Sequence, residues 1–456
     1  MKDTAQILEK QHLYFAGGET LKRDFRKKQL LVLQKAVQES ETAIMTALQK
    51  DLNKSSFEGY ATEIGIVLEE LRFMLKNLDR FTRPRRVRTP LAHFLSTSTV
   101  YQEPYGVVLI MSPWNYPFQL TMAPLIGAIA AGNCVLVKPS AYSPHTSAVI
   151  QKIIGECFDE RYVAVVEGGR EVNQALLEER FDYIFFTGSV AIGKLVMGAA
   201  ARHLTPVTLE LGGKSPCIVD ETAHLALAGR RIAWGKYLNA GQTCVAPDYV
   251  LVHKSKKEAL IEEIRKSIRQ FYGEEPHHNR DYPKIINEKH FDRLLGLMNS
   301  GIVAAGGRFN RETRQIEPTV LDAVAWDSPV MQEEIFGPIL PVLEFEEVSE
   351  VIGLINARPK PLALYLFTTS AAHEQEILSR ISFGGGCIND TVVHLATSHM
   401  AFGGVGESGM GGYHGEASIR TFSHSKSILK KSNLLDVPLR YPPFKNHLSL
   451  LKKIMK

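Results

Sequence analysis

The stretch FDYIFFTGSVAIGKL, residues Phe181–Leu195, decides the fold class. A short apolar run typical of a buried strand ends in a Gly-Ser turn, and helical patterning begins near Val190. The stretch nearly matches the P-loop motif G-x-x-x-x-G-K, but Leu195 stands where a hydroxyl group would hold magnesium. The free N–H groups at such a helix start can bind a pyrophosphate, although an ordinary strand-to-helix turn has the same pattern.

Strands and helices alternate on both sides of this stretch. Strand-like runs fall at 106–111, 134–140, 162–169 and 207–213, and a second series falls at 217–220, 249–253, 340–345 and 362–367. Helices are predicted at 117–133, 143–158, 224–241 and 256–273. In the second of these Ser143 is the expected N-cap and Pro144 the first helical residue. This alternation predicts parallel sheets, which bind ligands beyond the C-terminal ends of their strands.

The two ends of the chain differ from this pattern. Apolar residues recur every three or four positions through residues 22–80, which predicts amphipathic helices. The basic, proline-bearing stretch 80–90 interrupts them and is expected to be a solvated connector. The C-terminal HLSLLKKIMK mixes apolar residues with lysines, so it fits either a helix in weak contact with a membrane surface or a solvated terminus.

Composition excludes several classes of function. The 456 residues are 45% hydrophobic and 22% charged, as in a globular protein of two or three domains. The net charge of +4 gives no reason to expect nucleic acid as the main partner. Five scattered cysteines without a C-x-x-C pair favour a reducing cytoplasm over a disulfide framework or zinc cluster. No signal peptide and no run of about 18 apolar residues are found.

One cysteine, Cys244 in GQTCVAP, is a candidate nucleophile, although a cysteine in such a protein is more often buried packing. Besides GQTCVAP and FTGS, the sequence contains four further motifs: PWN (113–115), KPS (138–140), LELGGKSP (209–216) and EEIFGP (333–338). In their order and spacing, from about residue 105 to 415, these six motifs resemble the aldehyde dehydrogenase superfamily. The resemblance is closest to the class 3 type, in WGKYLNAGQTCVAPDYV, in FGGVGESGMGGYHG and in the short N-terminus.

This resemblance implies a mechanism that uses three side chains. Cys244 would attack the aldehyde carbon, because a thiolate is an effective nucleophile for a carbonyl group. The side-chain amide of Asn115 and the backbone N–H of Cys244 would stabilise the resulting oxyanion. Hydride would pass to NAD or NADP and leave a thioester, and Glu210 would activate the water that releases the acid.

The resemblance also implies a cofactor site. Gly188, Ser189 and Gly193 would form the pyrophosphate turn, and Lys138 would contact the ribose or phosphate of the adenosine half. Glu334 would bind the nicotinamide ribose, and Phe336 would pack at the nicotinamide side. Trp114 of the PWN motif completes the predicted cofactor-binding set. Ala141 stands where many relatives have an acid that binds the 2′-hydroxyl group of NAD, so we expect NADP to be tolerated.

The expected fold is α/β, with a Rossmann-like cofactor domain (1–84 and 105–210) and a second α/β catalytic domain (211–395). A small β bridging and oligomerisation region (85–104 and 396–456) is expected to join two chains in a homodimer. The predicted substrates are medium- or long-chain aliphatic or aromatic aldehydes. A CoA-acylating relative and a non-catalytic homologue remain alternatives. The histidines form no ligand cluster, so no metal site is predicted.

Overall fold

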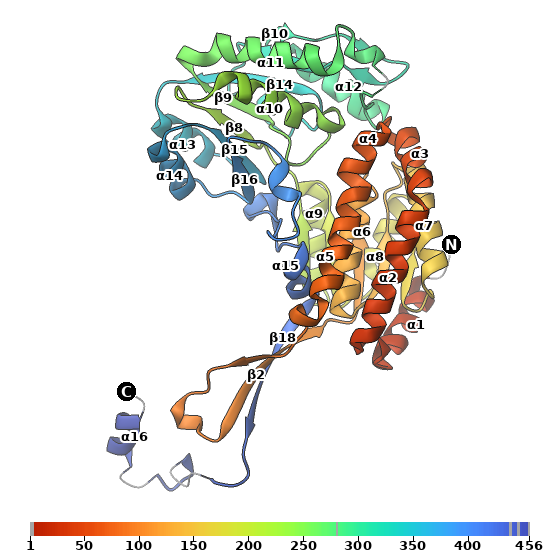
Figure 1. Ribbon diagram of the computed structural model, residues 1–456, viewed down its shortest axis with the longest axis vertical. Helices are drawn as coiled ribbons and strands as arrows, with labels where there is room; N and C mark the ends of the chain where they lie inside the picture. The colour runs from red at the N-terminus through yellow and green to blue at the C-terminus, as the bar shows by residue number, and fades with distance from the viewer. Residues whose placement is uncertain (1–3, 280, 437–439, 445–446, 455–456) are drawn as a thin grey trace.

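The computed structural model describes residues 4–279, 281–436, 440–444 and 447–454. Two parallel sheets flanked by helices lie side by side, and a long β-arm projects away from them (Figure 1). The predicted α/β fold class is therefore confirmed. Within the described part of the chain, no helix is both long and apolar enough to cross a membrane.

The first sheet has six strands in the order β17-β7-β6-β3-β4-β5. Every pair is parallel except β17 with β7. The central strands are buried along their whole length, which explains their uninterrupted apolar runs. The strands are β3 (Val107–Met111), β4 (Cys134–Lys138), β5 (Val163–Val165), β6 (Tyr183–Thr187), β7 (Val207–Glu210) and β17 (Gly409–Met410).

Helices cover this sheet, and the predicted helical N-terminal region is confirmed. They are α1 (Thr4–Ala16), α2 (Arg23–Glu39), α3 (Glu41–Leu52), α4 (Ser56–Gly59), α5 (Gly65–Phe81), α6 (Gln119–Ala131), α7 (Pro144–Cys157), α8 (Arg170–Glu178) and α9 (Val190–Ala201). A single π-helical turn, η2 (Tyr60–Ile64), lies between α4 and α5. All residues of α6 are buried, because it packs against the sheet on one side and against α2 and α5 on the other.

The start of α7 differs in one respect from the prediction. Ser143 occupies the N-cap position and Pro144 opens the helix, but the Ser143 hydroxyl makes no capping bond. Instead the carboxylate of Asp51 accepts hydrogen bonds from the backbone N–H groups of His145 and Thr146. A carboxylate at a helix N-terminus also interacts favourably with the helix dipole. The cap therefore comes from α3, ninety residues earlier in the chain and invisible to local sequence rules.

The second sheet has seven strands in the order β10-β13-β14-β9-β8-β15-β16, and only β10 runs antiparallel to its neighbour. Its strands are β8 (Pro216–Val219), β9 (Tyr249–His253), β10 (Ile302–Ala305), β13 (Thr319–Asp322), β14 (Ile339–Phe345), β15 (Ala363–Phe367) and β16 (Gly385–Ile388). Its helices are α10 (Leu225–Tyr237), α11 (Lys257–Tyr272), α12 (Glu288–Leu297), α13 (Val348–Asn356) and α14 (Ala371–Arg380). A two-stranded ribbon, β11 (Phe309–Asn310) with β12 (Gln315–Ile316), completes this part.

The arm is a three-stranded antiparallel sheet in the order β1-β2-β18. Strands β2 (Ser96–Pro104) and β18 (Ser423–Lys431) pair along their whole length, and β1 (Arg85–Val87) lies outside β2. Helix α15 (Gly415–Thr421) packs on α6 and connects the arm to the first sheet. Beyond β18 a short helix, α16 (Leu448–Ile454), covers the described part of the C-terminal tail (Figure 1).

We propose residues 1–84 with 105–210, 211–395, and 85–104 with 396 onward as the three domains. The first domain supplies the parallel strands of the first sheet, and the second domain supplies those of the second sheet. The arm strands come from the third domain. The third also contributes β17 to the first sheet, where Gly409 pairs with Glu210. The bridging region thus reaches the end of the strand that carries a predicted catalytic residue.

Candidate active site

The three predicted catalytic residues come from separate loops that meet between the two sheets. Asn115 follows β3, Glu210 is the last residue of β7, and Cys244 lies in the loop before β9. Cys244 lines a cavity together with Tyr116, and the carboxyl group of Glu210 is close enough to raise the pKa of the thiol. The fold therefore brings together residues that are up to 129 positions apart in the sequence.

The loop before Cys244 departs from the predicted helix. Helix α10 ends at Tyr237, and a left-handed turn follows in which Asn239 has φ 52°, Ala240 51° and Gly241 73°. Non-glycine residues in this region cost about 1–2 kcal/mol each, so the turn persists only because its surroundings hold it. A Cβ atom on Gly241 would lie 2.2 Å from the carbonyl oxygen of Gly337, which requires glycine there.

Hydrogen bonds hold this turn in place. The backbone carbonyl of Gln242 accepts from the side-chain amides of Asn115 (3.0 Å) and Asn239 (3.1 Å). The Gln242 side chain donates to the Lys284 carbonyl and accepts from the backbone N–H of Ile286. Gln242 was not among the predicted site residues. Its position two residues before Cys244 makes it the link between the nucleophile loop and the loop after β3.

The surroundings of Cys244 favour the neutral form of its thiol. Burial raises its pKa, and the nearby carboxyl groups of Glu334 and Glu210 raise it further. The backbone N–H groups of Cys244 and Val245 act in the opposite direction, because they hydrogen-bond the sulfur and favour its anionic form. The same N–H groups are available near any oxyanion formed on an aldehyde attached to this sulfur.

Glu210 carries an unpaired buried carboxyl group. The residue is 3% exposed, and within the described part of the chain neither carboxyl oxygen has a hydrogen-bond partner. Burial raises the pKa of this group well above its ordinary value. Buried polar groups normally have partners because an unsatisfied one costs about 1–3 kcal/mol. An unpaired carboxyl group beside a thiol is therefore more consistent with chemistry than with stability.

An apolar cavity of about 150 Å³ opens onto Cys244. The hydroxyl of Tyr116 hydrogen-bonds that of Thr243 at 2.6 Å, so both are satisfied and the wall presents little free polarity. The other lining residues are Ala61, Thr62, Ile66, Gln119, Leu120, Trp234, Leu238, Val392, Val393, Leu395, Ala396, Phe402, Tyr413 and His414. Tyr413 lines the cavity but was not among the predicted site residues. Burial raises its pKa, and Glu210 and Cys244 raise it further.

The predicted pyrophosphate turn fits a dinucleotide phosphate. Helix α9 starts directly after Ser189, whose side chain makes no capping bond, so the first N–H groups of the helix remain available to an anion. A Cβ atom on Gly188 would lie 2.6 Å from the Phe186 ring, and one on Gly193 would lie 2.6 Å from Leu211. Close packing therefore requires glycine at both positions and leaves the backbone open to a ligand.

Lys138 ends β4 at the same edge of the sheet. Its ammonium group donates to the Pro139 carbonyl at 2.7 Å, and burial lowers its pKa to about 8. A buried lysine with a single carbonyl acceptor has donors left for a hydroxyl or phosphate group. Ala141, three residues further, is exposed and presents no charge.

Glu334 and Phe336 lie in the loop before β14, and the ring of Phe336 contacts that of Trp114 in the loop after β3. A Cβ atom on Gly212 would fall 1.9 Å from a carboxyl oxygen of Glu334, so the glycine pair after β7 admits this side chain. Burial, with a contribution from Asp248, raises the Glu334 pKa to about 8. The rings of Trp114 and Phe336 meet edge to face with centroids 5.3 Å apart. The EEIFGP motif thus lies in the loop before β14, a setting that its sequence did not reveal.

The sequence model of the aldehyde dehydrogenase family matches residues 2–428. The chain belongs to the aldehyde dehydrogenase family. This aldehyde dehydrogenase is 50% identical to the 4,4′-diaponeurosporen-aldehyde dehydrogenase of Staphylococcus aureus, over 97% of each chain. It is 45% identical to the dimeric NADP-preferring aldehyde dehydrogenase of Rattus norvegicus, over 97% of this chain and 98% of the other. The predicted enzyme class is therefore confirmed.

Solved structures agree with this assignment. The aldehyde dehydrogenase resembles the substrate-bound state of Staphylococcus aureus AldH with a TM-score of 0.98, at 48% identity and over the whole of both chains. It also resembles a betaine aldehyde dehydrogenase of Staphylococcus aureus in complex with NAD+, with a TM-score of 0.86 and 26% identity. That match covers 96% of this chain and 89% of the other.

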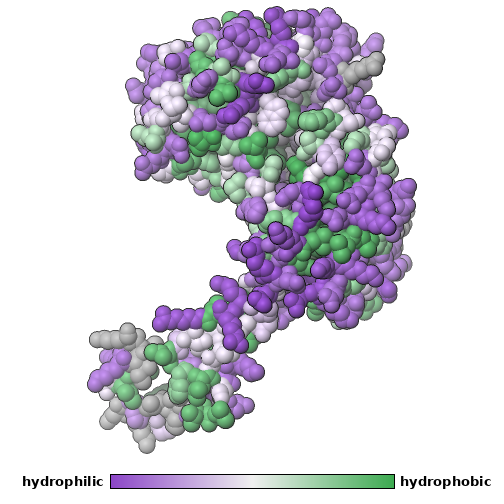
Figure 2. All heavy atoms as spheres, viewed as in Figure 1, coloured by the Kyte–Doolittle hydropathy of each residue, from purple (hydrophilic) through white to green (hydrophobic). Residues whose placement is uncertain are grey.

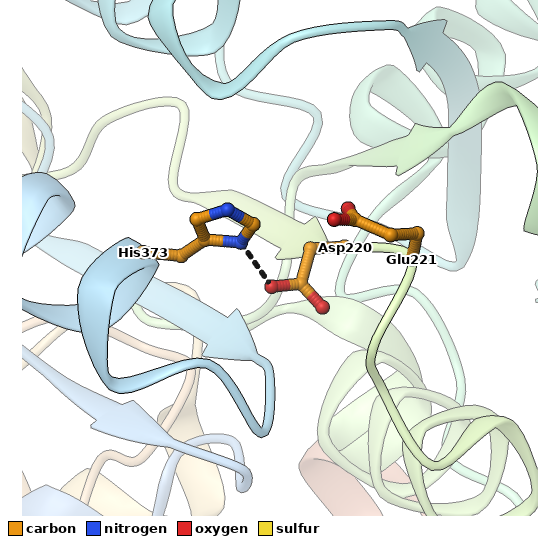
Figure 3. Close-up of side chains that lie close together, drawn as sticks. All are labelled: Asp220, Glu221 and His373. Atoms are coloured by element: carbon orange, nitrogen blue, oxygen red, sulfur yellow. Dashed lines mark hydrogen bonds and ion pairs between the residues drawn. The ribbon is translucent and has the colours of Figure 1, made fainter.

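One cluster outside the site has the composition of a metal site. Asp220, Glu221 and His373 lie close together at the end of β8, and His373 is hydrogen-bonded to Asp220 at 2.8 Å (Figure 3). The oxygens of Asp220 are already occupied, because they accept from Thr222, Thr368 and His373. The cluster is therefore explained as a hydrogen-bonded strand end of this aldehyde dehydrogenase.

Proposed function

We propose that this enzyme oxidises apolar aldehydes, medium- or long-chain aliphatic or aromatic, to carboxylic acids through a thioester on Cys244. The observation that carries the proposal is a thiol at an apolar cavity, beside a buried carboxyl group that has no other partner. The substrate is expected to be apolar because the lining residues expose far more carbon than polar surface. Both features are needed for one reaction, and neither stabilises the fold.

The first step forms a bond between Sγ of Cys244 and the aldehyde carbon. The thiol loses its proton to solvent, and the carbonyl electron pair moves to oxygen as the new bond forms. The side-chain amide of Asn115, which donates one hydrogen to Gln242, directs its second hydrogen at the oxyanion together with the Cys244 backbone N–H. Glu210 stays free for the water of the last step, where its raised pKa makes the deprotonated group an effective proton acceptor.

NAD or NADP is the cofactor, and when bound it supplies the hydride acceptor. Its pyrophosphate would lie on the turn formed by Gly188, Ser189 and Gly193. Lys138 would hold the adenosine half, and Glu334 would bind the nicotinamide ribose. Trp114 and Phe336 would enclose the nicotinamide side of the thiol and exclude water from it. Without an acid at residue 141, the 2′-phosphate of NADP meets no repulsion there.

The last step releases the acid. The thioester on Cys244 is attacked by a water molecule whose proton passes to Glu210. The oxyanion again lies against Asn115, the Cys244–carbon bond breaks, and the thiol recovers its proton. An enzyme that transfers its acyl group to CoA does not need a buried base at this position, so Glu210 favours hydrolysis over the CoA-acylating alternative.

We further propose a homodimer formed through the arm, in a reducing cytoplasm. Strand β18 is an edge strand whose outer side is free to pair within the described residues. Its Ile428 and Leu429 are almost half exposed, as is Phe94 beside it, and apolar side chains gather on the arm in Figure 2. A relative in Rattus norvegicus is named as dimeric. All five cysteines are free thiols.

The test compares turnover of an aldehyde panel, graded by chain length and including benzaldehyde, in the wild-type enzyme and in Cys244→Ala. NAD(P)H formation is expected with apolar aldehydes only, and the Cys244→Ala variant is expected to be inactive. Intact-mass spectra of rapidly quenched wild-type enzyme should show an acyl adduct that the variant lacks. Turnover by Cys244→Ala would overturn the proposal. Acyl transfer to CoA in preference to water would favour the CoA-acylating alternative.

A further inference from the structure

A fully buried ion pair lies under the loop that carries Asn115. The ammonium group of Lys54 is 2.6 Å from a carboxylate oxygen of Glu63, and neither side chain is exposed to solvent. Lys54 follows α3 and Glu63 lies in the π-helical turn η2, so both come from the N-terminal helical region. Neither residue belongs to any motif of the family resemblance.

Both partners of this pair also bind the loop after β3. Lys54 donates to the backbone carbonyl of Asn115 at 3.0 Å, and its ammonium group lies 3.9 Å from the centre of the Tyr116 ring. The second carboxylate oxygen of Glu63 accepts from the backbone N–H groups of Phe118 (3.0 Å) and Gln119 (2.9 Å). One ion pair thus holds the loop between β3 and α6 at its middle and at its junction with α6.

A second carboxylate of the same segment holds the opposite loop. Glu58 of α4 accepts from the backbone N–H of Asn239 at 2.9 Å. Asn239 in turn donates to the Asn115 carbonyl at 2.8 Å, the same oxygen that Lys54 binds. Residues 54–63 therefore bind the loop of the oxyanion amide and the left-handed turn that precedes Cys244.

Stability alone does not explain this arrangement. Removing two charges from water costs about as much as the ion pair returns, so an apolar pair of similar size is often equally stable. A buried pair does, however, fix geometry, because each unsatisfied donor or acceptor is costly. The left-handed turn at 239–241 needs such external support, since two of its residues are not glycine.

The π-helical turn connects this anchor to the substrate cavity. Ala61 and Thr62 line the cavity, and the next residue, Glu63, points to Lys54. A π-turn inserts one extra residue into a helix and is frequent at functional sites. Here the turn places adjacent residues at the substrate cavity and in the buried ion pair.

We propose that Lys54, Glu58 and Glu63 are positioning residues, which set the distance between the Asn115 amide and the Cys244 sulfur. This inference rests on the role of Asn115 proposed above. The segment acts on both loops at once, so its loss moves the oxyanion donors relative to the nucleophile without removing any group that touches substrate. Misplacement of catalytic groups by about 1 Å can cost up to about 100-fold in rate.

The test measures kcat/KM for an apolar aldehyde and the Kd of NADP in full-length variants. Lys54→Met and Glu58→Ala are each expected to lower kcat/KM about 10- to 100-fold and to leave the Kd of NADP unchanged. Glu58→Gln keeps an acceptor for the Asn239 N–H and should recover activity, which separates hydrogen bonding from charge. Asn115→Ala sets the scale, with an expected loss of about 100- to 1000-fold.

Stability is separated from positioning by a double variant. Lys54→Met alone leaves the Glu63 carboxylate without its cation, so the Tm of this variant should fall. The double variant Lys54→Met/Glu63→Gln should recover the Tm but not kcat/KM. Arg26→Met is the matched control, because it removes a buried cation that donates to the backbone carbonyls of Thr20 and Leu21 and to that of Ala130 at the C-terminal end of α6. It should keep wild-type kcat/KM in the folded enzyme.

Three outcomes would overturn the inference. If Asn115→Ala is severely impaired while folded Lys54→Met and Glu58→Ala retain activity within twofold of wild type, the positioning role is wrong and the proposed function survives. If kcat/KM in the double variant returns together with Tm, the pair is only structural. Wild-type activity in Asn115→Ala would instead refute the oxyanion assignment and this inference with it.

Discussion

The side-chain amide of Asn115 donates to the backbone carbonyl of Gln242, with 3.0 Å between Nδ2 and the oxygen. This bond joins the loop after the third strand to the loop of the nucleophile, and it fixes the plane of the amide. The second amide hydrogen then has a defined direction before any aldehyde arrives. Donors that are oriented in advance need not reorganise during the reaction, which is why they contribute strongly to catalysis.

Glu210→Gln should separate the two halves of the reaction. The amide is nearly isosteric with the carboxyl group but cannot accept a proton from water. We expect the thioester to form and then to persist, so intact-mass spectra of the variant mixed with NADP and aldehyde should show a stable acyl adduct on Cys244. Steady-state turnover should fall about 100- to 10,000-fold. Rapid multiple turnover in the variant would contradict the assignment of Glu210 as the base.

The activity should rise with pH above neutrality. Burial, Glu334 and Glu210 all raise the pKa of the Cys244 thiol, so the thiolate fraction grows as pH increases. Below this pKa, kcat/KM is expected to increase by up to about tenfold per pH unit. The raised pKa of Glu210 acts in the same direction, because a base must be deprotonated. Stopped-flow measurements of kcat/KM from pH 6 to pH 9 test this, and a flat profile would contradict it.

Ala141→Glu should change the choice of cofactor. A carboxylate at this exposed position can accept hydrogen bonds from the 2′-hydroxyl group of NAD and repels the 2′-phosphate of NADP. We expect kcat/KM for NADP to fall at least tenfold while that for NAD is maintained or rises. Ala141→Gln, which adds a similar side chain without the charge, is the control. A wild-type preference for NAD of a hundredfold or more would show that the alanine is not permissive.

Glu58→Gln should change the pH dependence of stability. Burial raises the pKa of Glu58 from 4.5 to about 7. Protonation of Glu58 therefore stabilises the folded protein fully below pH 4.5. This contribution to the free energy of unfolding is lost as the pH rises through 7. The titratable groups that interact with it are Lys54, Glu63, Asp281, Tyr116, Tyr272 and Tyr282.

Urea unfolding at pH 5 and pH 8 measures this effect. The free energy of unfolding of the wild type, relative to Glu58→Gln, is expected to be lower at pH 8 than at pH 5 by about 1–3 kcal/mol. Subtracting the variant removes the contribution of all other titrating groups. An equal difference at both pH values would mean that the folded pKa of Glu58 is near its ordinary value.

Much of the fold and the site chemistry could be predicted because it depends on local signals. Apolar runs and helical periodicity indicated the parallel core of the first sheet and the strands β8, β9, β14 and β15 of the second, but not β10, β13 or β16. The motifs around Asn115, Glu210 and Cys244 placed these residues at strand ends or in loops, which the structure brings together. Their catalytic roles stay predictions until the variants above are measured.

What sequence reasoning missed depends on contacts between distant segments. Lys54 and Asn115 are 61 residues apart, and a lysine in a helical stretch gives no sign that it will be buried. The left-handed turn after Tyr237 continues the helical composition of α10, and only Gly241 hints at its end. Asp51 replaces Ser143 as the cap of α7 for the same reason, since its partner lies on another helix.

The π-helical turn ties two properties of the enzyme to one short segment. Ala61 and Thr62 line the cavity, while their neighbour Glu63 helps to anchor the loop that carries Asn115. Mutations of Ala61 or Thr62 that enlarge the cavity are therefore expected to displace Glu63 and to lower the reaction rate. New aldehyde preferences are expected to evolve instead through lining residues such as Val393 and Leu395, which make no contact with the anchor among the hydrogen bonds and ion pairs described above.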